Sequence, residues 1–275
     1  MRNLKFILTI SLIWAGICLA DSQRFAEINE PLKDVDEIVN KANIASYYQG
    51  SDGKAKVKMT ITDIRGLERN REFIILRKNT EQGGDQKYFV YFQRPADVRG
   101  MVFMVHKYVD DDKDDDRWLY MPGLDLVRRI ASGDKRTSFV GSDYLYEDVS
   151  GRSLTEDTHE LIETTDKYYL VKNTPKNPDN VEFSYYNVYI DRENFMPYKM
   201  EYFKTAGGEE KLYRSIEAKE IEEIDGYPTV VKSLVKNIET ESETFMEFSD
   251  ISYDIDLKDI FTERYLRRPP REATR

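Results

Sequence analysis

The sequence predicts a mainly β protein, in which about a dozen antiparallel strands follow one N-terminal amphipathic helix and form one large, strongly curved sheet or barrel. Three observations support this fold class. Apolar and polar residues alternate over many short segments, clusters of Gly, Pro, Asn and Asp separate most of these segments, and no crossover helices intervene. Because no composition break, flexible linker or internal repeat interrupts the chain, the sequence indicates one domain.

The helix is predicted from Ile28 to about Tyr48, where Gly50 and Gly53 end it. Its apolar residues recur at steps of three and four, which places them on one face of a helix. This face consists of Ile28, Leu32, Val35, Ile38, Val39 and Ala42. The spacing by itself indicates only that the helix packs on a core.

The strands begin after Gly53, where Ala55, Val57, Met59 and Ile61 alternate with lysine and threonine residues. Further strands are predicted at Arg71–Lys78, Lys87–Gln93, Met101–Lys107, Arg117–Met121, Leu126–Ile130, Tyr168–Asn173, Phe183–Asp191, Tyr198–Phe203, Leu212–Ile221, Thr229–Lys236 and Thr244–Ile251. The lysine-rich face of the first strand argues against an outer-membrane barrel, because a charge facing the lipid midplane costs about 2–4 kcal/mol.

Composition excludes several classes of function. The 275 residues contain 51 acidic and 41 basic side chains, and the net charge of -10 disfavours binding to nucleic acids or anionic membranes by bulk electrostatics. The single cysteine excludes an internal disulfide framework, and two histidines leave little material for a zinc site. The 12% aromatic content is too high for an unfolded chain.

The first twenty residues have the features of a secretory signal peptide, namely a basic start, an apolar run from Phe6 to Ala20 and a small residue at its end. We therefore expect residues 1–20 to be removed and residues 21–275 to form the mature domain in the periplasm. Two alternatives remain open, an uncleaved N-terminal anchor and lipid modification at Cys18. The bulky Ile17 before that cysteine disfavours the second.

The sequence offers no catalytic constellation, so we expect neither an enzyme nor a cofactor. His106 and His159 have no His or Cys neighbour at ligand spacing, and no phosphate-binding, zinc or nucleophile motif is present. The acidic run Asp110–Asp116 lacks the spaced glycine and the terminal glutamate of a calcium loop. It is predicted to be a solvated hairpin tip, and cation binding there remains the alternative.

The predicted inner face of the sheet is rich in Met, Phe and Tyr, which suit adaptable apolar binding surfaces. These side chains would either fill a closed core or line a cavity, and the pattern does not distinguish the two. The cavity hypothesis proposes the following lining candidates: Val57, Met59, Phe73, Ile75, Met101, Phe103, Trp118, Tyr120, Tyr144, Leu145, Tyr185, Tyr202 and Phe245.

Several segments carry a family resemblance. They are Phe92–Gly100, Arg117–Pro122, Arg128–Ile130, Ser138–Asp148, Asp225–Pro228 and Phe261–Leu266. Together they resemble the LolA-like family of outer-membrane lipoprotein-sorting proteins, and the resemblance extends from about Val35 to Leu266. The central segments are long and specific, whereas the acidic run and the length of the chain depart from the well-studied carriers, which leaves the cargo open.

The resemblance implies an incomplete, half-open antiparallel β-barrel of about eleven strands, with short plug helices over a hydrophobic cavity. It implies a periplasmic carrier that takes up the acyl chains of a lipoprotein or lipid and moves them between membranes. A transporter of the resistance-nodulation-division class and an outer-membrane acceptor are the implied protein partners. We expect a monomer. The alternative is an interaction module that works with such a transporter and binds no lipid.

Polar residues are predicted at the plug and the cavity mouth, and the candidates are Arg128, Arg129, Ser142, Asp143 and Asp148. Ser142 and Asp143 are good N-caps for a short helix over residues 143–149. Arg128 and Arg129 point to opposite sides of their strand, so one of them would pair with Asp143 or Asp148 or would contact a polar head group.

Overall fold

The computed structural model describes residues 31–110 and 112–274. The chain divides into two units, Met1–Lys33 and Asp34–Arg275, and the helices and strands described here belong to the second. The signal peptide predicted over residues 1–20, with Cys18 and the cleavage position at Ala20, lies outside the described residues.

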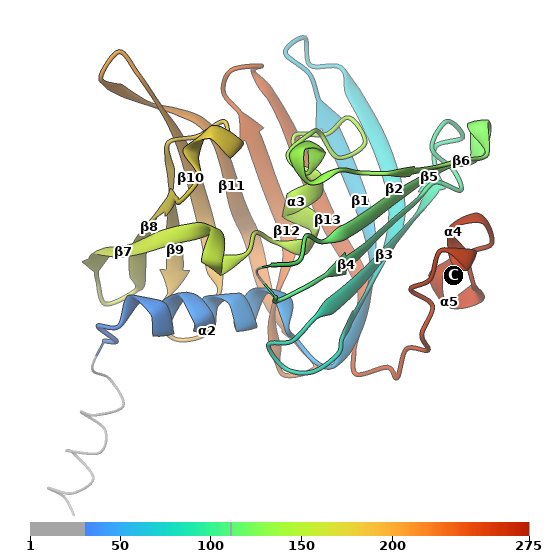
Figure 1. The fold of residues 1–275 in the computed structure, drawn as a ribbon, viewed down its shortest axis with the longest axis horizontal. Helices are drawn as coiled ribbons and strands as arrows, with labels where there is room; N and C mark the ends of the chain where they lie inside the picture. The colour runs from blue at the N-terminus through green and yellow to red at the C-terminus, as the bar shows by residue number, and fades with distance from the viewer. Residues whose placement is uncertain (1–30, 111, 275) are drawn as a thin grey trace, which may run out of the picture. The chain divides into compact units, whose positions relative to one another are not determined.

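One antiparallel sheet of thirteen strands forms the body of the second unit, in the order β6-β5-β4-β3-β2-β1-β13-β12-β11-β10-β9-β8-β7 (Figure 1). The strands of the first half are β1 (Asp52–Thr62), β2 (Glu68–Asn79), β3 (Gln86–Arg94), β4 (Val102–Lys107), β5 (Asp116–Met121) and β6 (Leu126–Arg129). The strands of the second half are β7 (Asp157–Thr164), β8 (Tyr168–Pro175), β9 (Tyr185–Asp191), β10 (Pro197–Ala206), β11 (Glu209–Ile224), β12 (Tyr227–Asn237) and β13 (Ser242–Tyr253).

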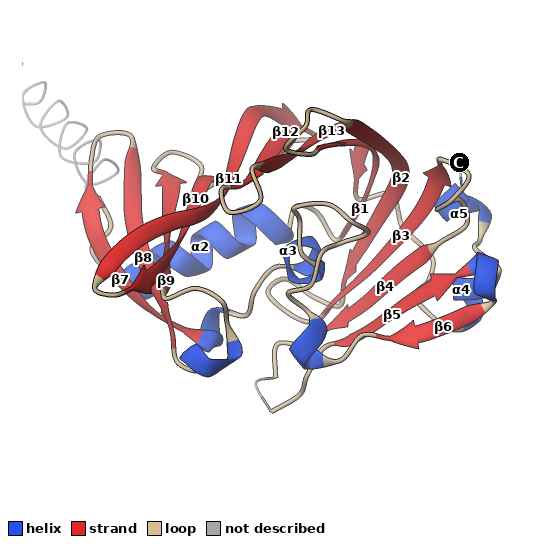
Figure 2. Ribbon diagram, turned by 90° about the horizontal axis from the view of Figure 1, so that it is seen from above, coloured by secondary structure: helices blue, strands red, loops and turns tan. Residues whose placement is uncertain are grey.

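The sheet is curved and open, so the prediction of a mainly β, half-open barrel is confirmed. Figure 2 shows the two halves as the sides of an arc, with helices in its hollow. The sheet has thirteen strands rather than about eleven, and β7 was missed by the sequence analysis. Its residues alternate weakly because it is an edge strand with a largely exposed second half.

Helix α2 (Val35–Tyr47) lies in the hollow of the arc and covers the concave face of the second half (Figure 2). Asp34 caps its start, where the carboxylate accepts the backbone N–H groups of Asp36 and Glu37 at 3.0 and 3.4 Å. Ile38, Val39 and Ala42 are buried, as the apolar stripe predicts. The helix begins later than predicted, because residues 31–34 are not helical.

The chain passes from β6 at one edge of the sheet to β7 at the other, so residues 130–156 cross the open side of the arc. We call this segment the plug. It carries helix α3 (Tyr146–Ser150) and inserts Phe139 and Tyr146 among Phe73, Phe92 and Phe103 of the first half. The plug therefore packs against part of the concave side of the first half.

The C-terminal segment covers the convex face of the same half. Residues 254–274, with short helices α4 (Arg264–Arg267) and α5 (Arg271–Thr274), follow β13 and pack across β2 to β5 (Figure 2). Phe261 and Leu266 are fully buried there against the outward side chains of Phe89 and Met104. Strands β2 to β4 are thus buried on both faces, which explains their nearly continuous apolar runs.

Candidate functional site

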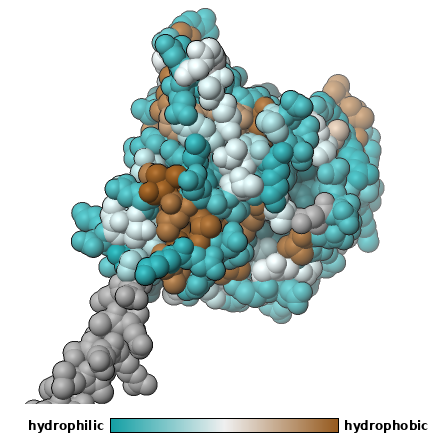
Figure 3. Space-filling view, turned by 60° about the vertical axis from the view of Figure 1, so that its left-hand side comes forward, coloured by the Kyte–Doolittle hydropathy of each residue, from teal (hydrophilic) through white to brown (hydrophobic). Residues whose placement is uncertain are grey.

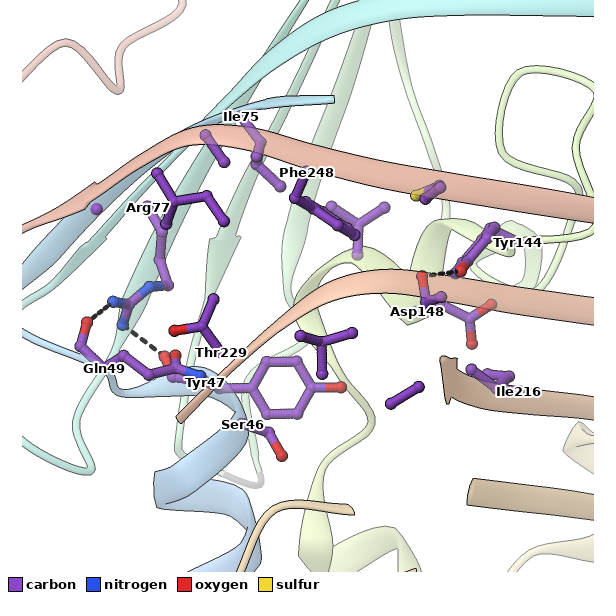
Figure 4. Close-up of a pocket in the computed structure, with 18 of the residues that line it drawn as sticks. Ser46, Tyr47, Gln49, Ile75, Arg77, Tyr144, Asp148, Ile216, Thr229 and Phe248 are labelled. Carbon is purple, nitrogen blue, oxygen red and sulfur yellow. Dashed lines mark hydrogen bonds between the residues drawn. The ribbon is translucent and has the colours of Figure 1, made fainter. Parts of the chain in front are cut away.

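A cavity of about 320 Å³ lies between the concave face of the sheet, the C-terminal end of α2 and the plug (Figure 4). This volume falls at the lower end of the range for ligand pockets. The lining includes Phe73, Ile75 and Val90 from the first half, Tyr144 and Val149 from the plug, and Met200, Ile216, Met246 and Phe248 from the second half. Residues from both halves and from the plug therefore enclose the same apolar space.

A second cavity of about 190 Å³ lies beneath α2, against β8 to β11. Its apolar lining includes Val39 and Ala42 of the helix and Val188 of the sheet. Tyr47 and Ile216 line both cavities, so the two spaces adjoin. Strands β1 to β3 border the larger cavity together with the second half, whereas the smaller cavity lies against the second half alone.

Three of the predicted lining residues border the larger cavity, and one more borders the smaller one. Phe73, Ile75 and Tyr144 line the larger cavity, and Tyr202, together with Tyr144, lines the smaller one. The Tyr144 hydroxyl lies 2.5 Å from Ser233 Oγ, which ties the plug to β12. Burial raises the pKa of Tyr144, so this hydroxyl stays protonated at neutral pH.

Four other candidates lie on the concave face but beneath the plug. Val57, Met59 and Phe103 are buried in the core that Phe139 enters, and Met101 packs against that core. They border neither cavity. For these residues the core-filling interpretation holds, because the plug occupies the space that an acyl chain would need.

Trp118 and Tyr120 were assigned to the wrong face of β5. Trp118 packs in the convex cluster with Phe261, and its ring meets that of His106 at 5.1 Å. Tyr120 packs against the same cluster, whereas Leu119 belongs to the concave core. Both faces of β5 carry apolar residues, so alternation alone did not show which face is inside.

The remaining candidates also lie away from the cavities. Tyr185 stacks on Phe203 at 4.9 Å and donates to Glu210 at 2.8 Å, and burial together with that bond raises its pKa to about 12. Phe245 is paired with Thr60 on the convex side, since its neighbours Thr244 and Met246 point inward. Leu145 is half-buried at the start of α3.

The predicted pairing of Arg128 or Arg129 with Asp143 or Asp148 is wrong. Arg128 is exposed and pairs with Asp134 at 3.0 Å, and Arg129 is exposed and pairs with Asp116. Their strand β6 is an edge strand, so both side chains are exposed to solvent and do not reach Asp143 or Asp148.

The two plug carboxylates have other partners. Asp148 forms a buried ion pair with Arg214 of β11, which the sequence analysis missed. Asp143 accepts hydrogen bonds from Ser242 Oγ at 2.5 Å and Thr244 Oγ1 at 2.7 Å, which anchors the plug to β13. Burial raises the pKa of Asp148 in spite of the neighbouring Arg214.

Ser142 and Asp143 do not cap a helix. The Ser142 hydroxyl donates to Phe139 O at 2.7 Å and closes a turn. Helix α3 begins only at Tyr146, and its start is held by Asp148, whose carboxylate accepts the Leu145 N–H at 2.7 Å. The capping acid is therefore inside the helix rather than before it.

A second ionic cluster holds the end of the plug. Glu147 contacts Lys135 at 2.9 Å and Arg152 at 3.4 Å, and Arg152 also contacts Asp157 of β7 at 2.8 Å. Burial alone would raise the pKa of Glu147, but Lys135 and Arg152 lower it below its ordinary value. Glu147 therefore stays ionised at neutral pH.

The remaining polar features have structural partners. His106 Nε2 lies 2.8 Å from Phe261 O, and His159 Nδ1 lies 2.7 Å from Asn173 Oδ1. In the acidic run, Asp115 pairs with Arg117 at 2.5 Å.

Within residues 31–110 and 112–274, no group of three or more potential ligands is placed to hold a metal ion. No helix in the same residues is both long and apolar enough to span a bilayer.

Solved structures share this architecture. A DUF1329 family protein from Desulfovibrio piger superposes with a TM-score of 0.75 at 26% identity, over 84% of this chain and 97% of its own. An outer membrane lipoprotein-sorting protein domain from Vibrio parahaemolyticus gives 0.74 at 24% identity, over 84% and 97%. A LolA superfamily protein from Nitrosomonas europaea gives 0.63 at 20% identity, over 85% and 100%.

Searching curated proteins gave no match. A protein-family model described as "uncharacterized protein" matches residues 84–268, which is more than half of the chain. The chain therefore belongs to this family of uncharacterized proteins, and its fold is LolA-like.

Proposed function

We propose that the protein is a periplasmic carrier that shelters the acyl chains of a lipid or lipoprotein in its cavity and moves them between membranes. The observation that carries this proposal is the apolar space between the sheet, α2 and the plug, which the protein's own side chains leave unfilled. The LolA-like fold and the lipoprotein-sorting description of the Vibrio neighbour support the same function.

The energetics of acyl chains explain why a carrier is needed. Each buried methylene gains about 0.8 kcal/mol, so moving a sixteen-carbon chain from a membrane into water costs on the order of 12 kcal/mol. An apolar cavity recovers much of this free energy. Most of the surface seen in Figure 3 is hydrophilic, and this hydrophilic surface keeps such a complex soluble. The same view also shows one apolar patch.

The direct test is mass spectrometry of a solvent extract of the purified mature protein, combined with titration of a fluorescent fatty acid. We expect lipid or acylated peptide in the extract and saturable binding of the probe. Recovery of neither, without probe binding, would refute the carrier function and leave the interaction module as the alternative.

A pair of variants on one strand localises the binding. Ile216 lines both cavities, so Ile216→Trp should fill the space and weaken probe binding at least about tenfold. Glu217, next along β11, pairs with Lys219 at the surface, and Glu217→Trp is the matched control with unchanged binding. Equal binding by both variants would place the lipid elsewhere.

A further inference from the structure

The larger cavity is polar at one end. Figure 4 shows Arg77, Gln49 and Thr229 gathered there, with Asp148 at the far end and Phe248 in the apolar stretch between them. A purely hydrocarbon ligand would need no such polar end. The arrangement fits an amphiphile that lies along the cavity with its head group near Arg77.

The charges around this cavity are mainly positive. Among its described lining residues, the cations are Lys54, Arg77 and Lys199, and the single carboxylate is Asp148. That carboxylate is matched by Arg214 at the far end, and Lys199 pairs with Glu201 at 2.6 Å. An excess of cations around a cavity is unexpected in a chain whose net charge is -10. Such an excess attracts a negatively charged ligand group.

Arg77 is the cation best placed to bind such a group. Arg77 is 9% exposed and lines the cavity. The guanidinium donates to Tyr47 O at 2.5 Å, to Asn79 Oδ1 at 2.8 Å and to Gln49 O. Tyr47 and Gln49 lie at the C-terminal end of α2, so Arg77 also stabilises that helix end.

Carbonyl oxygens accept from three of the five guanidinium N–H groups. Because carbonyls carry only partial charges, they do not neutralise the guanidinium. In the described part of the chain, no carboxylate lies within ion-pair distance of Arg77. Asp52 acts on it at longer range, but the Asp52 oxygens accept the N–H groups of Ile255 at 2.8 Å and Leu257 at 2.6 Å. Burial lowers the pKa of Arg77 below its ordinary value, as expected for an incompletely compensated charge.

A second donor lies at the same end. The Tyr253 hydroxyl is 3.0 Å from Thr229 Oγ1, and both residues line the cavity. Thr229 Oγ1 donates to Tyr227 O at 3.0 Å, so the Tyr253 proton is able to turn from Thr229 to a ligand oxygen. A guanidinium and a hydroxyl together suit the two oxygens of a carboxylate or a phosphate.

We propose that the cavity selects a single acyl chain with an anionic head group, a carboxylate or a phosphate, bound by Arg77 and Tyr253. The chain lies along Ile75 and Phe248 toward the plug. This inference rests on the proposed carrier function and adds the chemical class of the head group.

Head-group selectivity of the full mature chain tests this inference. The delipidated protein is loaded with the neutral dye Nile red, which palmitate, palmitoyl lysophosphatidate, hexadecanol and monopalmitoylglycerol then displace. Because hydrogen bonds to charged groups are stronger than those between neutral groups, the anionic ligands should bind at least about tenfold more tightly than the neutral ones. Comparing the two anions distinguishes a fatty acid from a phospholipid source.

The outcomes separate this inference from the carrier function. Equal displacement by all four ligands would overturn the anionic preference and leave the carrier function intact. If no ligand displaces the dye, both are refuted.

Variants then assign the preference to residues. Arg77→Met should abolish the preference while hexadecanol still binds, and Tyr253→Phe, which keeps the ring, should reduce the preference about threefold. Arg69→Met is the matched control, because Arg69 also lies on β2 but contacts Gly141 O outside the cavity lining. An undiminished preference in folded Arg77→Met, or in Tyr253→Phe if Arg77→Met does not fold, contradicts the assignment.

Discussion

The two halves of the sheet are packed differently. In the first half, the plug packs against part of the concave face and the C-terminal segment covers the convex face, and Phe89, Phe92 and Phe103 are each 0% exposed. In the second half, the concave face borders the cavities and α2, and Tyr186 and Tyr202 each retain 9% exposure. One half therefore supplies the packed aromatic core, whereas residues of both halves surround the larger cavity and the smaller cavity lies against the second half.

The plug meets the two halves through different chemistry. Toward the first half it presents aromatic rings, with Tyr146 5.0 Å from Phe103. Toward the second half it presents charges, in the pair of Asp148 with Arg214 and in the contact of Arg136 with Glu182 at 3.1 Å. Aromatic burial holds the plug on one side, and ionic contacts hold it on the other.

The largest expected effect is on the packed half. Phe92→Ala removes a fully buried ring that meets Phe73 at 5.1 Å and Phe139 at 5.8 Å, and should lower the free energy of unfolding by about 3–5 kcal/mol. Ile216→Ala, beside existing cavities, should cost only about 1–2 kcal/mol because its side chain has fewer partners to lose. Urea denaturation measures both, and equal costs would show that the halves are packed alike.

The next effect concerns the ionic side of the plug. Arg214→Met leaves Asp148 buried without its partner and should cost about 3 kcal/mol. Hydrogen exchange should then accelerate in residues 137–150. Adding Asp148→Asn removes the unpaired charge and should restore most of the stability. If the double variant is as unstable as the single one, the loss of stability comes from losing the ion pair itself and not from leaving Asp148 unpaired.

A smaller effect should appear as a dependence on pH. Lys107 of β4 donates to Ser150 O at 2.8 Å and Gly151 O at 3.0 Å at the end of α3, and burial lowers its pKa from 10.5 to about 8. Above about pH 8 the folded chain has released this proton and the unfolded chain has not. Stability should therefore increase with pH from about 8 toward 10.

Above pH 10 buried tyrosines reverse this trend, since burial raises the pKa of Tyr47 and the unfolded chain ionises first. Unfolding free energies of the wild type and of Lys107→Met, measured between pH 7 and 10, isolate the lysine. The variant should lose the rising slope, and an unchanged slope would assign it to another group.

The smallest effect is expected at the edge of the sheet. Arg128→Ala removes an exposed pair with Asp134 and should change stability by about 0.5 kcal/mol or less, without altering ligand binding. A marked loss of ligand binding would instead support the prediction from sequence that Arg128 lies at the cavity mouth.

Local patterns predicted the elements but not always the inner face. Every strand except β7 was predicted near its observed position, because strands read as short runs between turn residues. The inner face was correct on β2, where Phe73 and Ile75 border the cavity, and wrong on β5. When both faces of a strand are apolar, alternation no longer distinguishes them.

The sequence by itself determined the strand-rich architecture, the amphipathic helix α2 and the family resemblance, because each rests on neighbouring residues or on contiguous motifs. Only the tertiary structure decided which apolar side chains fill a core and which surround a cavity. It also decided that Asp148 pairs with Arg214 and that Arg77 lines the cavity with no carboxylate of residues 31–110 or 112–274 at ion-pair distance. These properties depend on residues that are distant along the chain, and the alternation of apolar residues within one segment contains no information about such contacts.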